Sequence, residues 1–224
     1  MKTNFKFTKL MVLMVLVISS ACNKDDNADI PQVSAPTASL SNPNFTTAFF
    51  TAGQTQAPTV NWNGDTGLFS LGTNIPGTTV NVSNGVISWG KSLPLGSNTI
   101  QLIASNSEGQ TSLEITIDNQ FSGNFDGAYN TDPNSTTTDF DFEMNFNADG
   151  TLTAIDGGTS EALGTWTISG TTITSVYSYN AGVSNNTIVT DVMHSETEAT
   201  ISGFWSGGET LSDPASGYLS LDIE

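Results

Sequence analysis

The sequence DFDFEMNF, residues 139–146, decides the fold class. Its apolar residues, Phe140, Phe142, Met144 and Phe146, alternate strictly with acidic or amide residues. Successive side chains of a β-strand point to opposite faces of the sheet, so a period of two predicts a strand with one apolar face and one solvated face. This segment therefore predicts a strand of an antiparallel sheet whose apolar face covers a core.

Further strand patterns follow this segment at short intervals. Residues 147–150 form a turn sequence that leads into a strand at 151–155, and Ser169-Gly170 marks the turn of a hairpin over 164–174. Later strands are expected at 187–193, 199–205 and 217–223. Together these segments predict an antiparallel meander of about eight short strands across residues 121–224.

The first half of the chain carries a second set of strand patterns. The apolar residues of 99–104 share one face, and a segment with the same alternation follows at 112–117, so the two predict a β-hairpin around a six-residue polar loop, 105–110. Another pair of short strands surrounds Ser83-Asn84. Beyond residue 40 no long window has apolar residues at helical spacing, so we predict an all-β chain.

Two segments of the first half resemble a known class of module. Residues 85–89 (GVISW) and 95–109 (LGSNTIQLIASNSEG) resemble the last three strands of Ig-like and cadherin-like modules of bacterial surface proteins. The resemblance covers residues 36–118 and implies an Ig-like β-sandwich that serves as a spacer, an adhesive unit or a carbohydrate-binding module. Within it, we expect Trp89 to pack in the core and Trp62, in a polar turn-rich segment, to be exposed.

Four short motifs in the second half also carry a resemblance. They are Gly127-Ala128-Tyr129, Phe146 to Thr151, Gly164 to Ile168 and Gly203-Phe204-Trp205. In this order they resemble lipocalin-like β-barrels of bacterial lipoproteins. A barrel of about eight strands is just filled by side chains or holds one small ligand. We therefore predict an Ig-like β-sandwich followed, at 121–224, by a small antiparallel meander β-barrel that is lipocalin-like.

The N-terminus has the pattern of an export signal. Three lysines precede the apolar run Leu10–Ile18, which is too short to span a membrane and suits the apolar core of a signal peptide. The Ser20-Ala21-Cys22 sequence that follows resembles the lipobox of bacterial lipoproteins, whose cysteine is diacylated and becomes the mature N-terminus. We therefore expect a signal peptide at 1–21 and a lipid anchor on Cys22.

An acidic segment follows this cysteine. Residues 22–35 contain Lys24-Asp25-Asp26, a proline and no periodic pattern, so we expect a disordered linker. A lysine followed by acidic residues resembles the signal that sends some Gram-negative lipoproteins to the outer face of the outer membrane. The expected location is therefore the outer membrane, exposed at the cell surface.

The charge of the chain excludes some partners. The chain has 22 Asp+Glu and 5 Lys+Arg, and only Lys24 and Lys91 follow the signal peptide. So few cations cannot neutralise phosphates, which excludes nucleic acid. The expected partners are the outer membrane, through the lipid, and either a glycan or another envelope protein. No internal disulfide is possible because Cys22 is the only cysteine.

Residue types that carry catalysis or bind metals are sparse. His194 is the only histidine and lies in a predicted turn, so we expect neither a Ser-His-Asp triad nor a zinc site, and no cofactor. Asp-containing turns, such as 63–65 and 147–150, offer oxygen ligands and leave calcium as an alternative to their role in turn formation.

The leading functional interpretation is a non-enzymatic, lipid-anchored surface protein that acts as a binding or adhesion module, with carbohydrate as the expected ligand. Exposed aromatic rings would stack on sugar faces, and the candidates are Trp62, Tyr177 and Tyr179. One alternative is a carrier that holds a small apolar ligand in the barrel among Phe140, Phe142, Phe146 and Trp166. A second is a hydrolase that uses the carboxylates of Asp139, Asp141 and Glu143, whose spacing overlaps that of glycosidase pairs.

Overall fold

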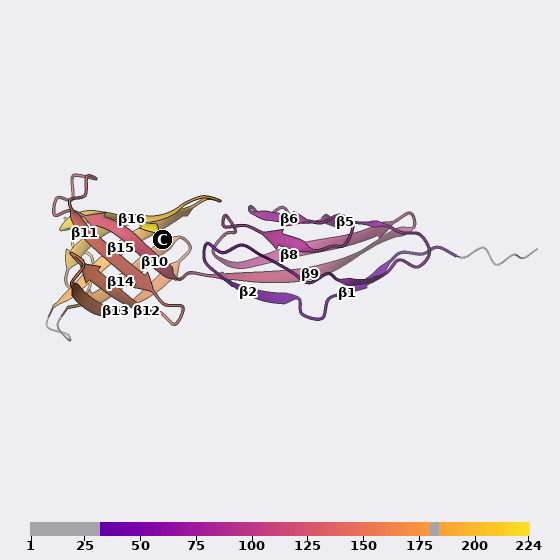
Figure 1. The fold of residues 1–224 in the computed structure, drawn as a ribbon, viewed down its shortest axis with the longest axis horizontal. Helices are drawn as coiled ribbons and strands as arrows, with labels where there is room; N and C mark the ends of the chain where they lie inside the picture. The colour runs from indigo at the N-terminus through magenta and orange to yellow at the C-terminus, as the bar shows by residue number, and fades with distance from the viewer. Residues whose placement is uncertain (1–31, 180–183) are drawn as a thin grey trace, which may run out of the picture. The chain divides into compact units, whose positions relative to one another are not determined.

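Strands make up all the regular structure of the residues that the computed structural model describes, 32–179 and 184–224 (Figure 1). These residues form 17 strands and no helix, which confirms the predicted all-β class. Residues 33–224 belong to one compact unit. None of the described residues lies in an apolar helix of membrane-spanning length. The predicted signal peptide, Cys22 and the linker up to residue 31 lie outside the described residues.

The second half of the chain is a closed barrel of eight antiparallel strands, as predicted (Figure 1). Each strand pairs with the next in sequence, and the last pairs with the first, with Phe125 opposite Ile223 and Tyr129 opposite Leu219. Closure leaves no unpaired strand edge. The strands are β10 (Gly123–Tyr129), β11 (Phe140–Phe146), β12 (Thr151–Asp156), β13 (Ser160–Ser169), β14 (Thr172–Ser178), β15 (Asn185–His194), β16 (Ala199–Gly207) and β17 (Gly217–Ile223).

The alternating segment that predicted a strand is β11. Phe142, Met144 and Phe146 are buried inside the barrel, while Asp141 and Asn145 are exposed. The period of two in the sequence therefore matches the two faces of the barrel wall.

Three motif glycines allow neighbouring strands to approach closely. A Cβ at Gly164 would lie 2.1 Å from the Val176 carbonyl oxygen, and a Cβ at Gly203 would lie 2.1 Å from the Val189 carbonyl oxygen. At Gly127 the corresponding distance, to a carbonyl oxygen of β17, is 2.4 Å. Glycines at such positions let strands bend tightly around a small barrel. Each stands two positions before an aromatic residue: Tyr129, Trp166 and Trp205, respectively.

The first half of the chain forms sandwich-like sheets. One sheet has the order β2-β9-β8-β5, a second has the order β3-β7-β6, and β1 pairs with β4. Both predicted strand pairs are present, as the β8–β9 hairpin and as the antiparallel pair β6–β7. The strands are β1 (Thr37–Ser39), β2 (Asn44–Ala48), β3 (Gly53–Gln54), β4 (Thr59–Asn61), β5 (Leu68–Leu71), β6 (Thr78–Val80), β7 (Ile87–Trp89), β8 (Gly96–Asn106) and β9 (Gly109–Gln120).

The loop of the long hairpin differs from the prediction. Instead of six residues, 105–110, only Ser107 and Glu108 separate β8 from β9. The Asn106 side chain accepts hydrogen bonds from the backbone amides of Glu108 and Gly109, at 3.0 and 3.1 Å, and so closes a tight turn. The other polar residues continue the strands because their backbone groups still pair across the hairpin.

A core of aliphatic residues and two aromatic rings holds these sheets together. Trp89 is 6% exposed, as predicted, and its indole N–H donates to the Thr47 hydroxyl at 3.4 Å. The buried members of this core are Phe69, Ile87, Trp89, Leu93, Ile100, Leu102, Ala104, Ile115 and Ile117.

The last residues of the predicted linker are hydrogen-bonded in the structure. The Ser34 amide donates to the Asn63 carbonyl at 3.1 Å, and its carbonyl accepts from the Asn106 side chain at 2.7 Å. The Ala35 carbonyl accepts from the Asn63 side chain at 2.7 Å. From Ser34 onward, the chain is therefore hydrogen-bonded to the sandwich-like sheets.

The segment between β9 and β10 closes one end of the barrel. Phe121 is 4% exposed, and its ring lies 5.2 Å from those of Phe49 and Phe146 and 5.3 Å from that of Trp166. Phe49 in turn packs edge-on against the His194 ring at 5.2 Å. Aromatic pairs at these separations stabilise packing beyond the area that they bury.

The β15–β16 turn is held from outside the barrel. The Glu196 carboxylate accepts hydrogen bonds from the Ser92 hydroxyl and from the backbone amides of Ser92 and Lys91. The hydrogen bond from the Ser92 hydroxyl is the main cause that lowers the pKa of Glu196. His194 lies 3.1 Å from the Leu93 carbonyl oxygen. His194 therefore packs against Phe49 and contacts the Leu93 backbone.

Candidate ligand pocket

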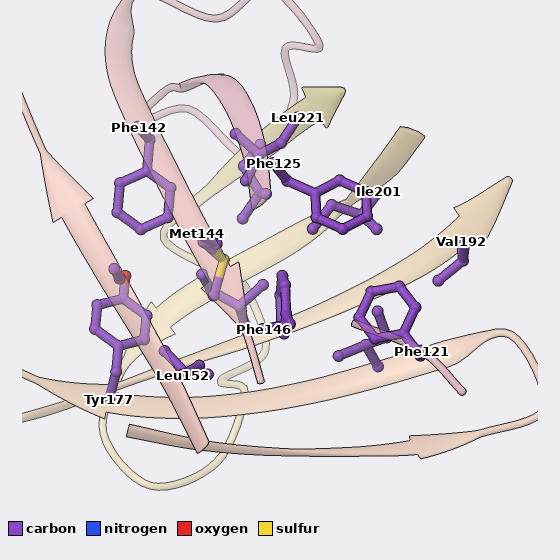
Figure 2. Packing of buried hydrophobic residues seen from close by; sticks show 14 of the residues in the cluster. Phe121, Phe125, Phe142, Met144, Phe146, Leu152, Tyr177, Val192, Ile201 and Leu221 are labelled. Carbon is purple, nitrogen blue, oxygen red and sulfur yellow. The ribbon is translucent and has the colours of Figure 1, made fainter. Parts of the chain in front are cut away.

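Most of the barrel interior is filled with side chains. Figure 2 shows Phe125, Met144 and Phe146 between Phe121 on one side and Tyr177 on the other. Phe125 and Met144 are fully buried, and Phe146 is 2% exposed. This half of the barrel is a packed core of the kind expected for eight strands.

The space that the apolar-carrier alternative requires is occupied by the rings themselves. The Phe146 and Trp166 rings lie 5.9 Å apart, and both contact Phe121. Phe140 lies at the start of β11, is 49% exposed and packs on Tyr129 at 5.3 Å. Of the four residues of that alternative, Phe142 lines a pocket inside the barrel, and Trp166 lines a separate one beside Phe121.

A pocket of about 130 Å³ lies at the end of the barrel away from Phe121. For comparison, an engineered apolar cavity of about 150 Å³ binds benzene, so this pocket suits one ring or a group of similar bulk. The lining comes from the ends of seven of the eight barrel strands and from the residue that follows β14. It consists of Tyr129, Phe142, Asp156, Tyr177, Tyr179, Asn186, Ile188, Trp205 and Leu219.

Five aromatic rings form the walls of this pocket. Tyr129 packs edge-on against Trp205 at 5.7 Å and 90°, and against Phe142 at 5.6 Å and 75°. Phe142 lies 6.0 Å from Tyr177, and Tyr177 meets Tyr179 at 5.8 Å and 82°. Because most of these rings meet nearly at right angles, they form a box, which we call the aromatic box.

Two side-chain hydrogen bonds hold the box in shape. The Trp205 indole N–H donates to the Asn130 carbonyl at 2.8 Å, and the Tyr129 hydroxyl donates to the Asp156 carboxylate at 3.3 Å. Gly217 leaves room for the hydrogen bond from Trp205 to Asn130, because a Cβ at Gly217 would lie 2.0 Å from the Asn130 carbonyl oxygen. The wall positions of Trp205 and Tyr129 are therefore fixed by specific partners.

Asn130 organises the loop behind Trp205. It is 2% exposed, and its amide nitrogen donates to the carbonyls of Ser135 and Thr137 at 2.8 and 2.7 Å. Its amide oxygen accepts from the Tyr218 backbone at 2.9 Å. One buried side chain thus ties the β10–β11 loop to β17, and such satisfied buried networks rigidify a site.

The pocket contains one carboxylate and three tyrosines. Burial, followed by the charge of Asp156, raises the pKa of Tyr129, and burial is also the main cause that raises the pKa of Tyr179 to about 12. Burial raises the pKa of Tyr177 further still. The tyrosines are therefore protonated and neutral at physiological pH, and Asp156 is the one acidic residue in the lining.

The structure brings together two of the three aromatic residues predicted from sequence. Tyr177 and Tyr179 both line the pocket. The expectation that they are exposed platforms is wrong for Tyr177, which is 6% exposed, because this face of β14 points into the barrel. Trp62 lies in the other half of the chain, where it is partly buried and packs against Phe69 at 5.4 Å.

Asp156 and Trp205 were missed as site residues. Asp156 follows Leu152 and Ala154 on the inward face of β12, and a carboxylate on an apolar face was the available signal. The sequence indicates Trp205 only as part of the Gly203-Phe204-Trp205 motif.

The acidic residues considered for catalysis or calcium lie elsewhere. Asp141 is exposed and Glu143 half-buried, both on the outer face of β11. Asp149 accepts two hydrogen bonds from Thr151, the main cause that lowers its pKa, which is the behaviour of a turn residue. Among residues 32–179 and 184–224, no group of three or more His, Cys, Asp or Glu side chains could hold a metal ion.

Comparisons with known protein families, with curated proteins and with solved structures find no match. The closed antiparallel barrel is compatible with a lipocalin-like fold.

Proposed function

We propose that this protein is a non-enzymatic binding protein of the bacterial cell surface that holds a small ligand, or one ring-sized part of a larger one, in the barrel pocket. The observation that carries the proposal is the aromatic box, a hollow in a barrel whose other half is filled. A lipid on Cys22 would tether the chain to the outer membrane, and the sandwich-like sheets would act as a spacer.

The charge of the barrel limits the ligand. Residues 121–224 contain 9 Asp and 6 Glu but neither Lys nor Arg, so no cationic side chain of the barrel could pair with a bound carboxylate or phosphate. The ligand is therefore uncharged or positively charged. The volume of the pocket, about 130 Å³, restricts the buried part to a single ring or a compact group, and a sugar ring is one candidate.

The chemistry of the lining supports binding without catalysis. Nucleophilic catalysis requires a nucleophile within hydrogen-bonding reach of a base that activates it. Tyr129 and Tyr179, which both donate to Asp156, are phenols whose raised pKa values oppose their ionisation. A single carboxylate also lacks the second carboxylate that glycoside hydrolysis uses.

The test is a binding screen followed by two matched variants. The full chain is screened on a glycan array and against a panel of small sugars and amines, and calorimetry then measures the affinity of each hit. Tyr179→Ala removes one wall of the pocket, whereas Tyr218→Ala removes a ring that instead packs on the half-exposed Phe204. We expect hits to bind Tyr218→Ala normally and Tyr179→Ala about tenfold more weakly, because aromatic anchors dominate binding. Absence of any hit, or equal affinities for the two variants, would overturn the proposal.

A further inference from the structure

The aromatic box surrounds whatever it holds with five aromatic rings. The ring pairs Trp205–Tyr129, Tyr129–Phe142 and Tyr177–Tyr179 meet at 90°, 75° and 82°, so the rings lie at steep angles to one another around the pocket. The face of an aromatic ring is the negative part of its quadrupole and attracts cations within about 6 Å. Boxes of this kind suit groups that place positive charge against several rings at once.

The hydrogen-bond donors of the box are mostly used within the protein. The Trp205 N–H donates to the Asn130 carbonyl and the Tyr129 hydroxyl donates to Asp156. The Tyr177 hydroxyl donates to that of Tyr179, which in turn donates to Asp156. A sugar ring needs donors as well as acceptors around its hydroxyls. Besides the Asn186 amide, the lining offers aromatic rings and the remaining lone pairs of a carboxylate, both of which favour positive charge.

The field of the barrel has the same sign. With 15 Asp and Glu and no Lys or Arg in residues 121–224, the barrel attracts cations from every side. Asp156 places one of those charges in the pocket, where it is partly buried among aromatic rings. Shape, hydrogen bonding and charge therefore select the same class of ligand.

We propose that the group bound in the aromatic box is an organic cation, of which a methylated ammonium group is the simplest form. This inference rests on the proposed binding function and names its ligand class. The rings would surround the methyl groups, and Asp156 would balance the charge from one side. A trimethylammonium group has a bulk similar to that of a benzene ring, which the volume of the pocket accommodates.

The experiment compares choline chloride with its neutral carbon isostere, 3,3-dimethylbutan-1-ol (dimethylbutanol below), by calorimetric titration of the full chain. The two molecules share one shape and differ in charge. We expect choline to bind more tightly by about tenfold, which corresponds to about 1.4 kcal/mol. Because this comparison uses the unaltered protein, it does not depend on the folding of any variant.

Two isosteric variants locate the charge that matters. Asp156→Asn keeps an acceptor oxygen for Tyr129 and removes the charge, and we expect about tenfold weaker choline binding with no change for the isostere. Asp141→Asn removes a charge from the exposed outer face of β11 and serves as the control, for which choline binding should stay the same.

The outcomes separate this inference from the function on which it rests. Equal binding of choline and dimethylbutanol, with no effect of Asp156→Asn, would overturn the cationic ligand and leave the pocket function intact. Failure of choline to bind while an uncharged hit from the screen binds would do the same. If no molecule binds at the pocket, both proposals are wrong.

Discussion

Replacement of Gly203 by alanine tests whether the close strand contacts in the barrel are required. Gly203 lies on the inward face of β16 between Ile201 and Trp205. A Cβ there would lie 2.1 Å from the Val189 carbonyl oxygen and 2.7 Å from the Thr190 Cα. Both are backbone atoms of β15, so no side-chain rotation relieves the overlap, and Gly203→Ala must move β15 away from β16.

The magnitude follows from two opposing effects. Overpacking against fixed atoms destabilises by about 1–3 kcal/mol, and a contact this short with backbone belongs at the upper end. Alanine also restricts the unfolded chain, which stabilises the folded state by about 0.4–1 kcal/mol. The expected net loss in the free energy of unfolding is therefore about 2 kcal/mol. Gly207→Ala, in the same strand, introduces a Cβ with no atom within 4 Å. It should therefore only restrict the unfolded chain, which stabilises the folded state.

Guanidinium unfolding followed by tryptophan fluorescence measures both variants. Trp166 and Trp205 report on the barrel, whereas Trp62 and Trp89 report on the other sheets. We expect a lower midpoint for Gly203→Ala in the barrel transition and an unchanged or higher midpoint for Gly207→Ala. If the two variants shift the midpoint equally, the backbone contact at Gly203 does not restrain the barrel and the reasoning is wrong.

Two further predictions concern buried hydroxyl groups. Among the described residues, the buried Thr190 hydroxyl has no hydrogen-bond partner, whereas the Thr187 hydroxyl donates to the Gly208 carbonyl at 2.8 Å. Thr190→Val should therefore raise the free energy of unfolding by about 1 kcal/mol and Thr187→Val lower it by about 1–2 kcal/mol, and a similar loss in both would refute the distinction. Burial also raises the pKa of Tyr177, so its contribution to stability is fully present below about pH 10 and is lost as the pH rises above it, by up to about 1.4 kcal/mol per pH unit. Denaturation at a series of pH values above about 10 should show this slope in the unaltered chain and a shallower one in Tyr177→Phe, and equal slopes would contradict the assignment.

The strands that the sequence predicts are those whose alternation is long enough to be read locally. The pattern of β11 depends on eight consecutive residues, 139–146, and β17 has the predicted bounds, Gly217–Ile223. β3, with two residues, carries too little alternation for a prediction, since its place in a sheet depends on its partner β7. The long hairpin was predicted with too wide a loop because polar residues near a turn can still pair as strand.

The pocket could be predicted only in part. Alternation places Ser175, Tyr177 and Tyr179 on one face, but a face of serine and tyrosine does not reveal which side is inward. That information comes from the pairing of β14 with β13 and β15 in a closed barrel. The role of Asn130 depends on a loop fold and on a distant strand, β17, and no local pattern reports either of these.

The hollow end of the barrel needs a physical explanation, because eight strands enclose a volume that side chains normally fill. At the end that Phe121 closes, Phe125, Met144 and Phe146 are almost fully buried, and the Phe125 and Phe146 rings pack edge-on at 5.7 Å. At the other end, Trp205 is held against the Asn130 carbonyl and Tyr129 against Asp156, so neither ring can turn inward to fill the space without losing a partly buried hydrogen bond. Each such loss costs about 1–3 kcal/mol, which opposes collapse of the box. The pocket is therefore as much a consequence of these two hydrogen bonds as of the rings that line it.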